Sequence, residues 1–418
     1  MGEKDFINEE SDAKTAVRTF PSHGYIATTN NHQTSKGGEM KVTKLKYRSR
    51  RGAATAAAFV VALSGSAVLM AAPSGAVAKP RATSMSWCGP KKASIALADG
   101  FGDNTWREIT RYSAVVVAAQ CKNVTKYVYT NGQGNTQKAI SDINSLVSQG
   151  ITAMVDFPDA GEAMLPALTK AYKAGTIVVP YRVSPGGRAG VNYNAFISTN
   201  FVSAGVLWGE DVASALHGKG NVAFLSGPPG NSQGLQELQG IKSIFKKYPG
   251  LKLVGQAPFN VTNWDPATTT TVVASLLSKY TINAVISDYG TALAGAFPDW
   301  KAAGQKIPVI ATEDGNSVGC AYKADHASDP AFKLFTVSSQ NWMVEYAIRY
   351  AVALATGGVL PTTNVPQENY ENSVTGKPYA PTCIPSLPAT AIDSSGLTPA
   401  QQRAALAGII PTLASLRK

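Results

Sequence analysis

The chain has 418 residues, with 38 Lys or Arg against 27 Asp or Glu, which gives a formal net charge of +11. After residue 78 the basic residues cluster no further than pairs such as Lys91-Lys92 and Lys246-Lys247. Nucleic acid requires a basic stripe on the protein surface, and no such stripe is present. We therefore exclude a nucleic-acid partner and interpret the charge as a solvated surface.

The amino-terminal part of the chain has the pattern of a secretory signal. A basic stretch, Lys41–Arg51, runs into the apolar segment Ala53–Ala72, and residues 76–78 supply the small Ala-x-Ala pattern of a cleavage site. Residues 40–78 are predicted to be a signal peptide, so the mature protein is expected in the periplasm or on the outer face of the cell membrane. Residues 1–39 are polar and without periodicity, which predicts either disorder or a start assigned upstream of the true one. The alternative interpretation of the apolar segment is one transmembrane helix.

All four cysteines follow the predicted signal, and an even count in an exported chain favours disulfides. Cys88 and Cys121 each precede one of two successive predicted strands, so both are expected at the amino-end edge of neighbouring parallel strands. We therefore expect the pairs Cys88–Cys121 and Cys320–Cys383. The alternative is a zinc site, but the chain has no CxxC motif and only two histidines follow the signal. Neither a metal ion nor another cofactor is expected.

Short runs of β-prone residues alternate with helix-spaced segments between Lys91 and Gly304. The first half is predicted to contain the strands Ser94–Ala98, Lys126–Thr130, Ala153–Phe157 and Ile177–Tyr181. A helix over Phe201–His217 opens the second half. Its strands are predicted at Asn221–Leu225, Leu251–Pro258, Ile282–Asp288, Val309–Thr312 and Phe332–Ser339.

This alternation predicts an α/β fold with two Rossmann-like lobes, whose parallel sheets are joined by a hinge that lets the lobes close on a ligand. A helix over Met343–Thr356 is predicted to return the chain to the first lobe. The expected first lobe is 90–199 with about 340–365, the second is 200–339 with about 366–384, and a tail spans 385–418. Within the tail, Thr398 is predicted to cap a helix.

Polar and aromatic residues gather at the carboxyl ends of the predicted strands, where an open parallel sheet binds small molecules. The segments are Ala98–Arg107, Val178–Arg182, Ile197–Asn200, Trp264–Pro266, Ile286–Tyr289, Ala311–Gly315 and Ser339-Gln340. In this order they resemble the sugar-binding proteins of bacterial ABC importers, the ribose-binding-like group of type I periplasmic binding proteins. The resemblance covers about Lys91 to Gly358. It implies a monomer that binds a monosaccharide or polyol, delivers it to a membrane permease and catalyses no reaction.

The chemistry of a sugar explains these residue types. A sugar ring has two weakly polar C–H faces and a belt of hydroxyl groups, so its site needs flat aromatic walls and planar hydrogen-bonding side chains. Trp106 and Trp264, one from each lobe, are predicted to sandwich the ring. The predicted rim consists of the donors Arg107 and Arg182, the acceptors Asp99, Asp288 and Asp314, and the mixed amides Asn104 and Gln340.

Two positions depart from the family pattern. Tyr181 stands where many relatives carry Asp beside the arginine, and Leu235 stands where a second-lobe arginine is often found. Both departures weaken the case for a pentose ligand. Gln233 or Gln236 is the candidate to supply the hydrogen-bond donor that Leu235 cannot provide.

The sequence also contains features that suggest other functions. Residues 230–234 match the G-x-S-x-G pattern of serine hydrolases, with Asp288, Asp314 and His326 later in hydrolase order. A nucleophile elbow needs its serine directly after the strand, and residues 227–229 separate the predicted strand from Ser232. A secreted hydrolase therefore stays the weaker alternative, and a sugar-sensing receptor that signals to a membrane kinase is the stronger one. A transcription regulator is excluded because the predicted signal stands where a helix-turn-helix would be.

Overall fold

A computed structural model describes residues 85–418, except for 103, 368, 375–376 and 379–382. The predicted signal peptide 40–78 and the stretch 1–39 both lie outside these residues. Among the described helices, none combines the length and the hydropathy that a bilayer crossing needs.

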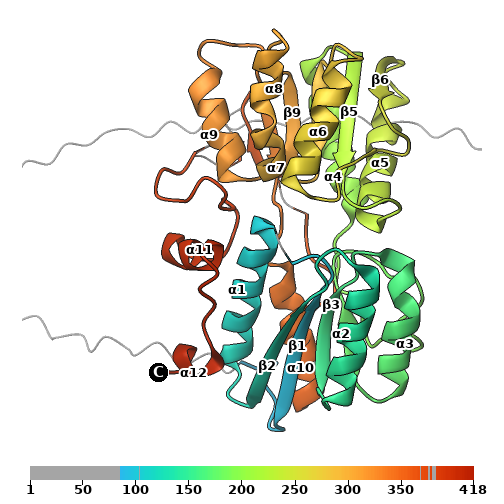
Figure 1. Ribbon diagram of the computed structural model, residues 1–418, viewed down its shortest axis with the longest axis vertical. Helices are drawn as coiled ribbons and strands as arrows, with labels where there is room; N and C mark the ends of the chain where they lie inside the picture. The colour runs from blue at the N-terminus through green and yellow to red at the C-terminus, as the bar shows by residue number, and fades with distance from the viewer. Residues whose placement is uncertain (1–84, 103, 368, 375–376, 379–382) are drawn as a thin grey trace, which may run out of the picture. The chain divides into compact units, whose positions relative to one another are not determined.

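The first lobe is a parallel sheet with helices on both faces (Figure 1), in the strand order β2-β1-β3-β4. The strands are β1 (Ala93–Asp99), β2 (Val124–Asn131), β3 (Ala153–Phe157) and β4 (Ile177–Pro180). The helices are α1 (Thr105–Gln120), α2 (Thr136–Ser148), α3 (Leu165–Lys173) and α10 (Met343–Thr356). Along β1, Ile95 and Leu97 pack with α1 and α10, whereas Ala96 and Ala98 pack with α2 and α3. Successive residues face opposite sides of a strand, so an apolar run is buried on both faces.

The second lobe has a larger sheet with the order β12-β11-β10-β9-β8-β5-β6, and β7 pairs with β5. Its strands are β5 (Lys219–Ser226), β6 (Gly250–Val254), β7 (Asn260–Val261), β8 (Ala284–Ser287), β9 (Val309–Glu313), β10 (Leu334–Val337), β11 (Asn369–Asn372) and β12 (Lys377–Pro378). Helices α4 (Phe201–Ala215) and α5 (Ser232–Phe245) cover one face. The other face carries α6 (Pro266–Leu277), α7 (Gly290–Gly295), α8 (Phe297–Ala302) and α9 (Asn316–Asp325). Among these described strands only β11 runs opposite to the others, since it pairs antiparallel with both β10 and β12.

The predicted elements are present with small differences at their ends. The helix predicted at Met343–Thr356 has those bounds in the structure, and it packs on the first sheet. The strand predicted at Leu251–Pro258 ends at Val254 instead. Gly255 follows with a φ of +95°, a left-handed conformation that a continuing strand does not adopt.

Three segments of chain connect the two sheets, and their described residues are 181–200, 338–342 and 357–367. Within the first segment a backbone bridge joins Tyr181 to Ile197. A second bridge, from Ser198 to Asn364, places the first and third segments side by side. The Gln340 side chain links the second segment to the third by donating from Nε2 to the carbonyl of Pro366 at 2.6 Å. These ties make the three segments one hinge.

Two disulfides join Cys88 to Cys121 and Cys320 to Cys383, as predicted. The first links the start of β1 to the start of β2, at the edge of the sheet opposite the strands' carboxyl ends. The second anchors the beginning of the carboxyl-terminal tail to α9 in the second lobe. The alternative of a zinc site is contradicted, because every cysteine is in a disulfide.

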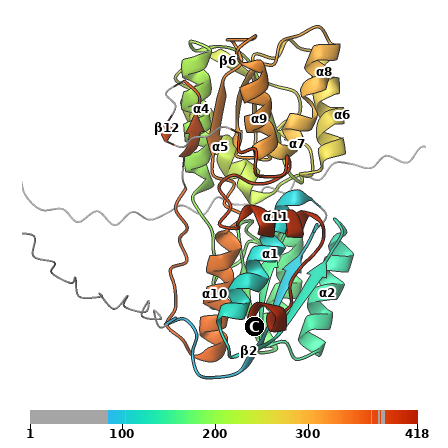
Figure 2. The same cartoon turned by 90° about the vertical axis from the view of Figure 1, so that its left-hand side faces the viewer.

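The tail residues 384–418, which we call the strap, contact both lobes. In the second lobe, the Asn316 amide donates to the carbonyls of Ile384, Leu387 and Pro388 at 3.1–3.2 Å. The strap then crosses to the first lobe, where α11 (Pro399–Leu406) and α12 (Leu413–Leu416) lie over α1 (Figure 2).

The end of the strap is held on the first lobe by Arg417. Its guanidinium donates to the carbonyls of Ala119, Cys121 and Val124 at 2.7–3.0 Å. The predicted cap is also present, since the Thr398 hydroxyl and the Gln401 side chain form a capping box at the start of α11. The strap is therefore a second physical link between the lobes, apart from the hinge.

We predict that Asn316→Ala lowers the stability of the protein by about 2–4 kcal/mol, because it leaves three strap carbonyls without their donor. Thermal denaturation should register this as a fall of several degrees in Tm. Asn144→Ala is the matched control, since the Asn144 amide bonds only to Ile140 within its own helix. Equal Tm values for the two variants would contradict the role given to Asn316.

Candidate ligand-binding site

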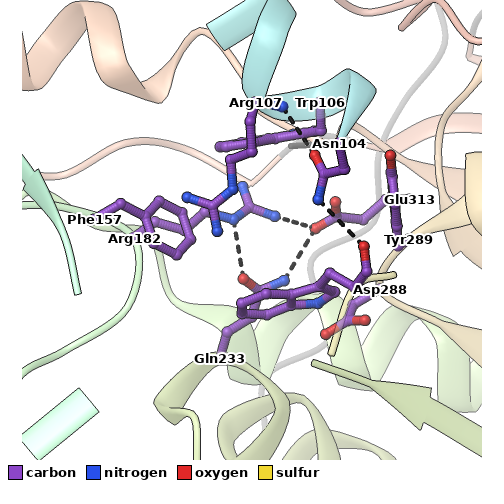
Figure 3. Close-up of a pocket in the computed structure, with 10 residues that line it drawn as sticks. Asn104, Trp106, Arg107, Phe157, Arg182, Gln233, Asp288, Tyr289 and Glu313 are labelled. Carbon is purple, nitrogen blue, oxygen red and sulfur yellow. Dashed lines mark hydrogen bonds and ion pairs between the residues drawn. The ribbon is translucent and has the colours of Figure 1, made fainter. Parts of the chain in front are cut away.

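A pocket lies between the lobes, at the carboxyl ends of the strands of both sheets (Figure 3). An open parallel sheet holds small ligands at this edge. The lining residues are Asn104, Trp106, Arg107, Phe157 and Arg182 from the first lobe, and Gln233, Trp264, Asp288, Tyr289 and Glu313 from the second. The pocket has a volume of about 20 Å³, which is roughly the space of one water molecule.

Three aromatic side chains form walls of the pocket. Trp106 and Phe157 meet edge to face with ring centroids 5.9 Å apart, and Phe157 meets Trp264 in the same way at 6.1 Å. The Trp106 indole is held in place because its Nε1 donates to the carbonyl of Ser339 at 3.2 Å. The two indoles come from opposite lobes, so closure of the lobes brings them to one site.

The second indole depends on an unusual backbone. Asn263 and Trp264 have φ values of +54° and +53°, a left-handed conformation that costs a non-glycine residue about 1–2 kcal/mol. The ring lies against Gly227, where a Cβ atom would be 2.2 Å from it, so only glycine fits there. The Trp264 carbonyl accepts a hydrogen bond from the Asn104 amide at 3.2 Å. Strain of this kind is typical of functional sites.

Arg107 is held within the first lobe. Its guanidinium carbon lies 3.4 Å from the centre of the Phe157 ring, in cation–π contact. It also pairs with Asp99 at 3.1 Å and with Asp159 at 2.5 Å. Burial lowers the pKa of Arg107, but the two carboxylates outweigh this effect and raise the pKa above its ordinary value. The charge of Arg107 is therefore retained and balanced by residues of its own lobe.

Arg182 reaches across to the second lobe. Its Nε donates to the Gln233 side chain at 2.9 Å, its Nη1 donates to the Ser339 carbonyl at 2.8 Å, and its Nη2 pairs with Glu313. Gln233 in turn donates to Glu313 at 3.2 Å. Arg182 has a φ of +63°, so its backbone too is in the left-handed region. These bonds fill the centre of the pocket with the protein's own side chains.

The acidic groups of the pocket are buried, and burial shifts their protonation. Burial raises the pKa of Glu313 to about 8, although the Arg182 charge opposes the shift. Burial also raises the pKa of Asp288 to about 6, although a hydrogen bond from Ser226 at 2.6 Å opposes it. Near neutral pH the two carboxyls can therefore differ in protonation, so one can donate a hydrogen bond while the other accepts.

Further hydrogen bonds join the lobes around the pocket. The hydroxyl groups of Thr105 and Tyr289 lie 2.9 Å apart, and the Ser184 backbone N–H donates to the Ser232 hydroxyl at 2.7 Å. The lobes are thus closed on each other. A ligand larger than a water molecule enters only when the lobes part or the side chains of the pocket turn away.

Six of the nine predicted site residues line the pocket, namely Asn104, Trp106, Arg107, Arg182, Trp264 and Asp288. The other three do not. Asp99 lies behind Arg107, to which it is bonded. Asp314 accepts from the Ser339 and Ser394 N–H groups, and Gln340 bonds to the hinge carbonyl of Pro366. These three side chains position the site and the hinge in this structure rather than facing a ligand.

Four residues that line the pocket were not among the nine predicted site residues, although the sequence pattern pointed to each of them. Phe157 is the last residue of a correctly predicted strand, so the rule of polar and aromatic strand ends applies to it as well. Gln233 was the candidate for a missing donor. Tyr289 and Glu313 belong to the strand-end segments named in the sequence analysis, but Asp314, the other acid at that strand end, was the predicted acceptor. Successive residues at a strand end point to opposite sides, and Glu313 is the one that faces the pocket.

The geometry does not assemble a serine hydrolase. The Ser232 hydroxyl, at the start of α5, accepts the Ser184 N–H. His326 lies at the end of α9, where its ring stacks on Tyr322. Asp314 is bonded to the strap. The residues of the hydrolase pattern therefore have separate partners in separate parts of the fold. The described residues also hold no cluster of three or more His, Cys, Asp or Glu that could bind a metal ion.

Comparison with known sequences gives a match over most of both lobes. A family model described as "Periplasmic binding protein domain" matches residues 95–358. The xylitol-binding protein of Mycolicibacterium smegmatis is 24% identical over 203 residues, covering 47% of this chain and 56% of that protein. The multiple sugar-binding periplasmic receptor ChvE of Rhizobium radiobacter is 28% identical over 204 residues, covering 44% and 57%. The matched regions thus span little more than half the length of these relatives.

Comparison with solved structures gives the same architecture. An ABC transporter solute-binding protein from Thermobispora bispora matches with a TM-score of 0.57 at 26% identity, covering 67% of this chain and 85% of that one. The predicted fold class, α/β with two lobes built on parallel sheets, is confirmed.

The raised pKa values of the buried acids predict that the stability of the folded protein depends on pH. Because the pKa of Glu313 rises from 4.5 to about 8 on folding, the folded protein holds a proton that the unfolded chain releases between these values. Raising the pH from about 5 to about 8 should therefore lower the free energy of unfolding of the ligand-free protein, by an amount on the order of a few kcal/mol.

Glu313→Gln tests this assignment by urea denaturation, since glutamine resembles the neutral carboxyl. The variant should match the unaltered protein near the lower pH and lose less stability toward the higher pH. The remaining slope comes from other buried acids, including Asp159, whose pKa burial raises to about 7. If the free energy of unfolding falls equally with pH in the two proteins, Glu313 does not titrate in this range.

Proposed function

We propose that this chain, which belongs to the periplasmic binding protein family, captures a monosaccharide or related polyol between its lobes and delivers it to the membrane permease of an ABC importer. Export through the predicted signal 40–78, to the periplasm or the outer face of the membrane, is part of this proposal. The protein acts by binding, and it catalyses no reaction.

One observation carries the proposal: two indoles from opposite lobes line a pocket whose other walls are two further aromatic rings together with guanidinium, amide and carboxyl groups. Indole plates suit the C–H faces of a sugar ring or the chain of a polyol. Each hydroxyl group both donates and accepts, so it needs a donor such as Arg182 and an acceptor such as Asp288. The pocket offers both kinds of partner from both lobes.

The charge balance of the pocket favours a neutral ligand. Arg107 is paired with Asp99 and Asp159, and Arg182 is bonded to Gln233, the Ser339 carbonyl and Glu313, so both guanidinium groups already have partners. A phosphate or carboxylate ligand would have to displace these ion pairs. Hydroxyl groups can instead insert among charged partners that already balance each other. The names of the relatives, which bind xylitol and several sugars, agree with this class of ligand.

Binding is coupled to closure of the lobes. In the closed form, Arg182, Gln233 and Glu313 satisfy one another across the pocket. A sugar that enters the open form would take over these bonds, and it would stabilise the closed form by the difference in its contacts with the two forms. A wrong epimer would leave one buried partner without a hydrogen bond, at a cost of about 1–3 kcal/mol. Selectivity would arise in this way.

The sensing alternative shares this capture step. A receptor that reports to a membrane kinase would use the same lobes and the same pocket, and it differs only in the protein that recognises the closed form. One of the relatives is named a receptor. Loss of uptake of the bound sugar on deletion of the gene supports the transport role, and normal uptake supports sensing.

The central test is a thermal-shift screen of residues 79–418 against pentoses, hexoses and polyols, followed by calorimetry with the best ligand. Trp106→Ala should weaken that ligand at least tenfold, because one wall of the pocket is lost. Trp106→Phe, which keeps an aromatic wall, should restore part of the affinity.

Trp87→Ala is the matched control, because Trp87 is only partly buried against the first-lobe core, next to the disulfide residue Cys88, and does not line the pocket. It should leave affinity unchanged. Equal affinity in the Trp106→Ala protein, with its fold intact, would remove Trp106 from the site. Failure of every sugar and polyol to raise Tm would overturn the proposed function itself.

A further inference from the structure

A second cavity lies in the same cleft, next to the pocket described above. It has a volume of about 220 Å³, against about 20 Å³ for the first pocket. The residues that line it are Gly100, Phe101, Gly134, Thr136, Ala139, Asp159, Ala160 and Met164 from the first lobe, and Pro228 and Asn263 from the second. Like the first pocket, it takes its walls from both lobes, so closure forms it as well.

The two cavities share their boundary. Asn263 lines the second cavity while its neighbour Trp264 lines the first, and both have left-handed backbones. On the opposite side, Arg107 of the first pocket is bonded to Asp159 of the second at 2.5 Å. These two pairs form the partition between the cavities, so a ligand that occupies both must pass between them.

The lining of the second cavity repeats the chemistry of the first. Phe101 supplies an aromatic wall, and its ring rests against Gly134, where a Cβ atom would be 3.2 Å from it. Gly134 has a φ of +69°, so a larger residue is disfavoured there in two ways. The rim is polar, with a hydroxyl group from Thr136 and an amide from Asn263.

Asp159 supplies a carboxyl group that can accept hydrogen bonds. Its Oδ1 is bonded to Arg107, and a carboxylate has room for about four hydrogen bonds, so the group can accept further donors from the cavity. An aromatic wall combined with a hydroxyl, an amide and a carboxylate suits a polyhydroxylated ring better than a purely apolar group.

We propose that the second cavity is a subsite for a second sugar unit, joined through a glycosidic bond to the unit held in the first pocket. The ligand class of the protein would then include disaccharides as well as monosaccharides. This inference depends on the proposed function, since it extends the same ligand from one cavity to the next. The first unit would stack between the two indoles, and the second would stack on Phe101 with its hydroxyl groups toward Asp159 and Thr136.

The test compares monosaccharides with disaccharides that contain them, by thermal shift and then by calorimetry. The panel holds glucose, galactose, xylose and arabinose, together with maltose, cellobiose, lactose, melibiose and xylobiose, and the phenyl glycosides of the same sugars. We expect at least one disaccharide to bind more tightly than its component monosaccharide.

Ala160→Trp fills the second cavity without touching the first pocket. It should weaken the disaccharide at least tenfold and leave the monosaccharide unchanged. Ala163→Trp is the matched control, because Ala163 lies on the same turn, Gly161–Met164, but is exposed and lines neither cavity. Phe101→Ala is a second, smaller change that should also weaken only the disaccharide.

The outcomes separate the two proposals. Binding of monosaccharides without any disaccharide would overturn the subsite and leave the proposed function standing. Tighter binding of phenyl glycosides than of any disaccharide would also overturn it, because the cavity would then take an apolar group. Equal effects of Ala160→Trp and Ala163→Trp on disaccharide affinity would remove the second cavity from the binding site. Failure of every sugar to bind would overturn both proposals.

Discussion

The ion pair between Arg182 and Glu313 spans the cleft, and the closed arrangement depends on it. Both side chains are almost fully buried, and a buried charge is costly unless it is paired and hydrogen-bonded. Gln233 and the Ser339 carbonyl complete the pairing from the second lobe and the hinge. When the lobes part, water can hydrate both side chains, so the cost of breaking their contact is offset. The open and closed forms can then lie close in free energy, which lets a ligand decide between them.

Arg107 behaves differently, because all its charged partners lie in its own lobe. Asp99 and Asp159 hold its guanidinium over Phe157, beside Trp106. Because these contacts lie within one lobe, we expect this half of the site to keep its geometry when the cleft opens. A preformed half-site lowers the entropic cost of the first encounter with a ligand. Arg107 and its partners thus form a surface within the first lobe, whereas Arg182 and its second-lobe partners, Gln233 and Glu313, are the groups that exchange contacts on closure.

The strap is bonded to the end of β9, the strand that also carries Glu313 of the pocket. Glu313 faces the pocket, and the next residue, Asp314, accepts hydrogen bonds from the hinge and from Ser394 of the strap. Asn316 holds the beginning of the strap close by, and α11 and α12 hold its end against the first lobe. Opening of the cleft must therefore be accommodated by the strap as well as by the hinge. Residues 313–316 therefore contact the pocket, the hinge and the strap.

The sequence by itself determined the order of strands and helices, the two disulfides and the family, because apolar periodicity, cysteine positions and strand-end motifs are local properties of the chain. Tertiary structure alone decided which strand-end side chains face the cleft. Glu313 and Asp314 are adjacent acids, and a shift of one residue along a strand reverses the side to which a side chain points. Gln340 looked like a ligand donor but bonds to the hinge, because its partner comes from a segment far along the chain. The second cavity could not be predicted either, since its walls come from both lobes and exist as a cavity only where the lobes approach each other.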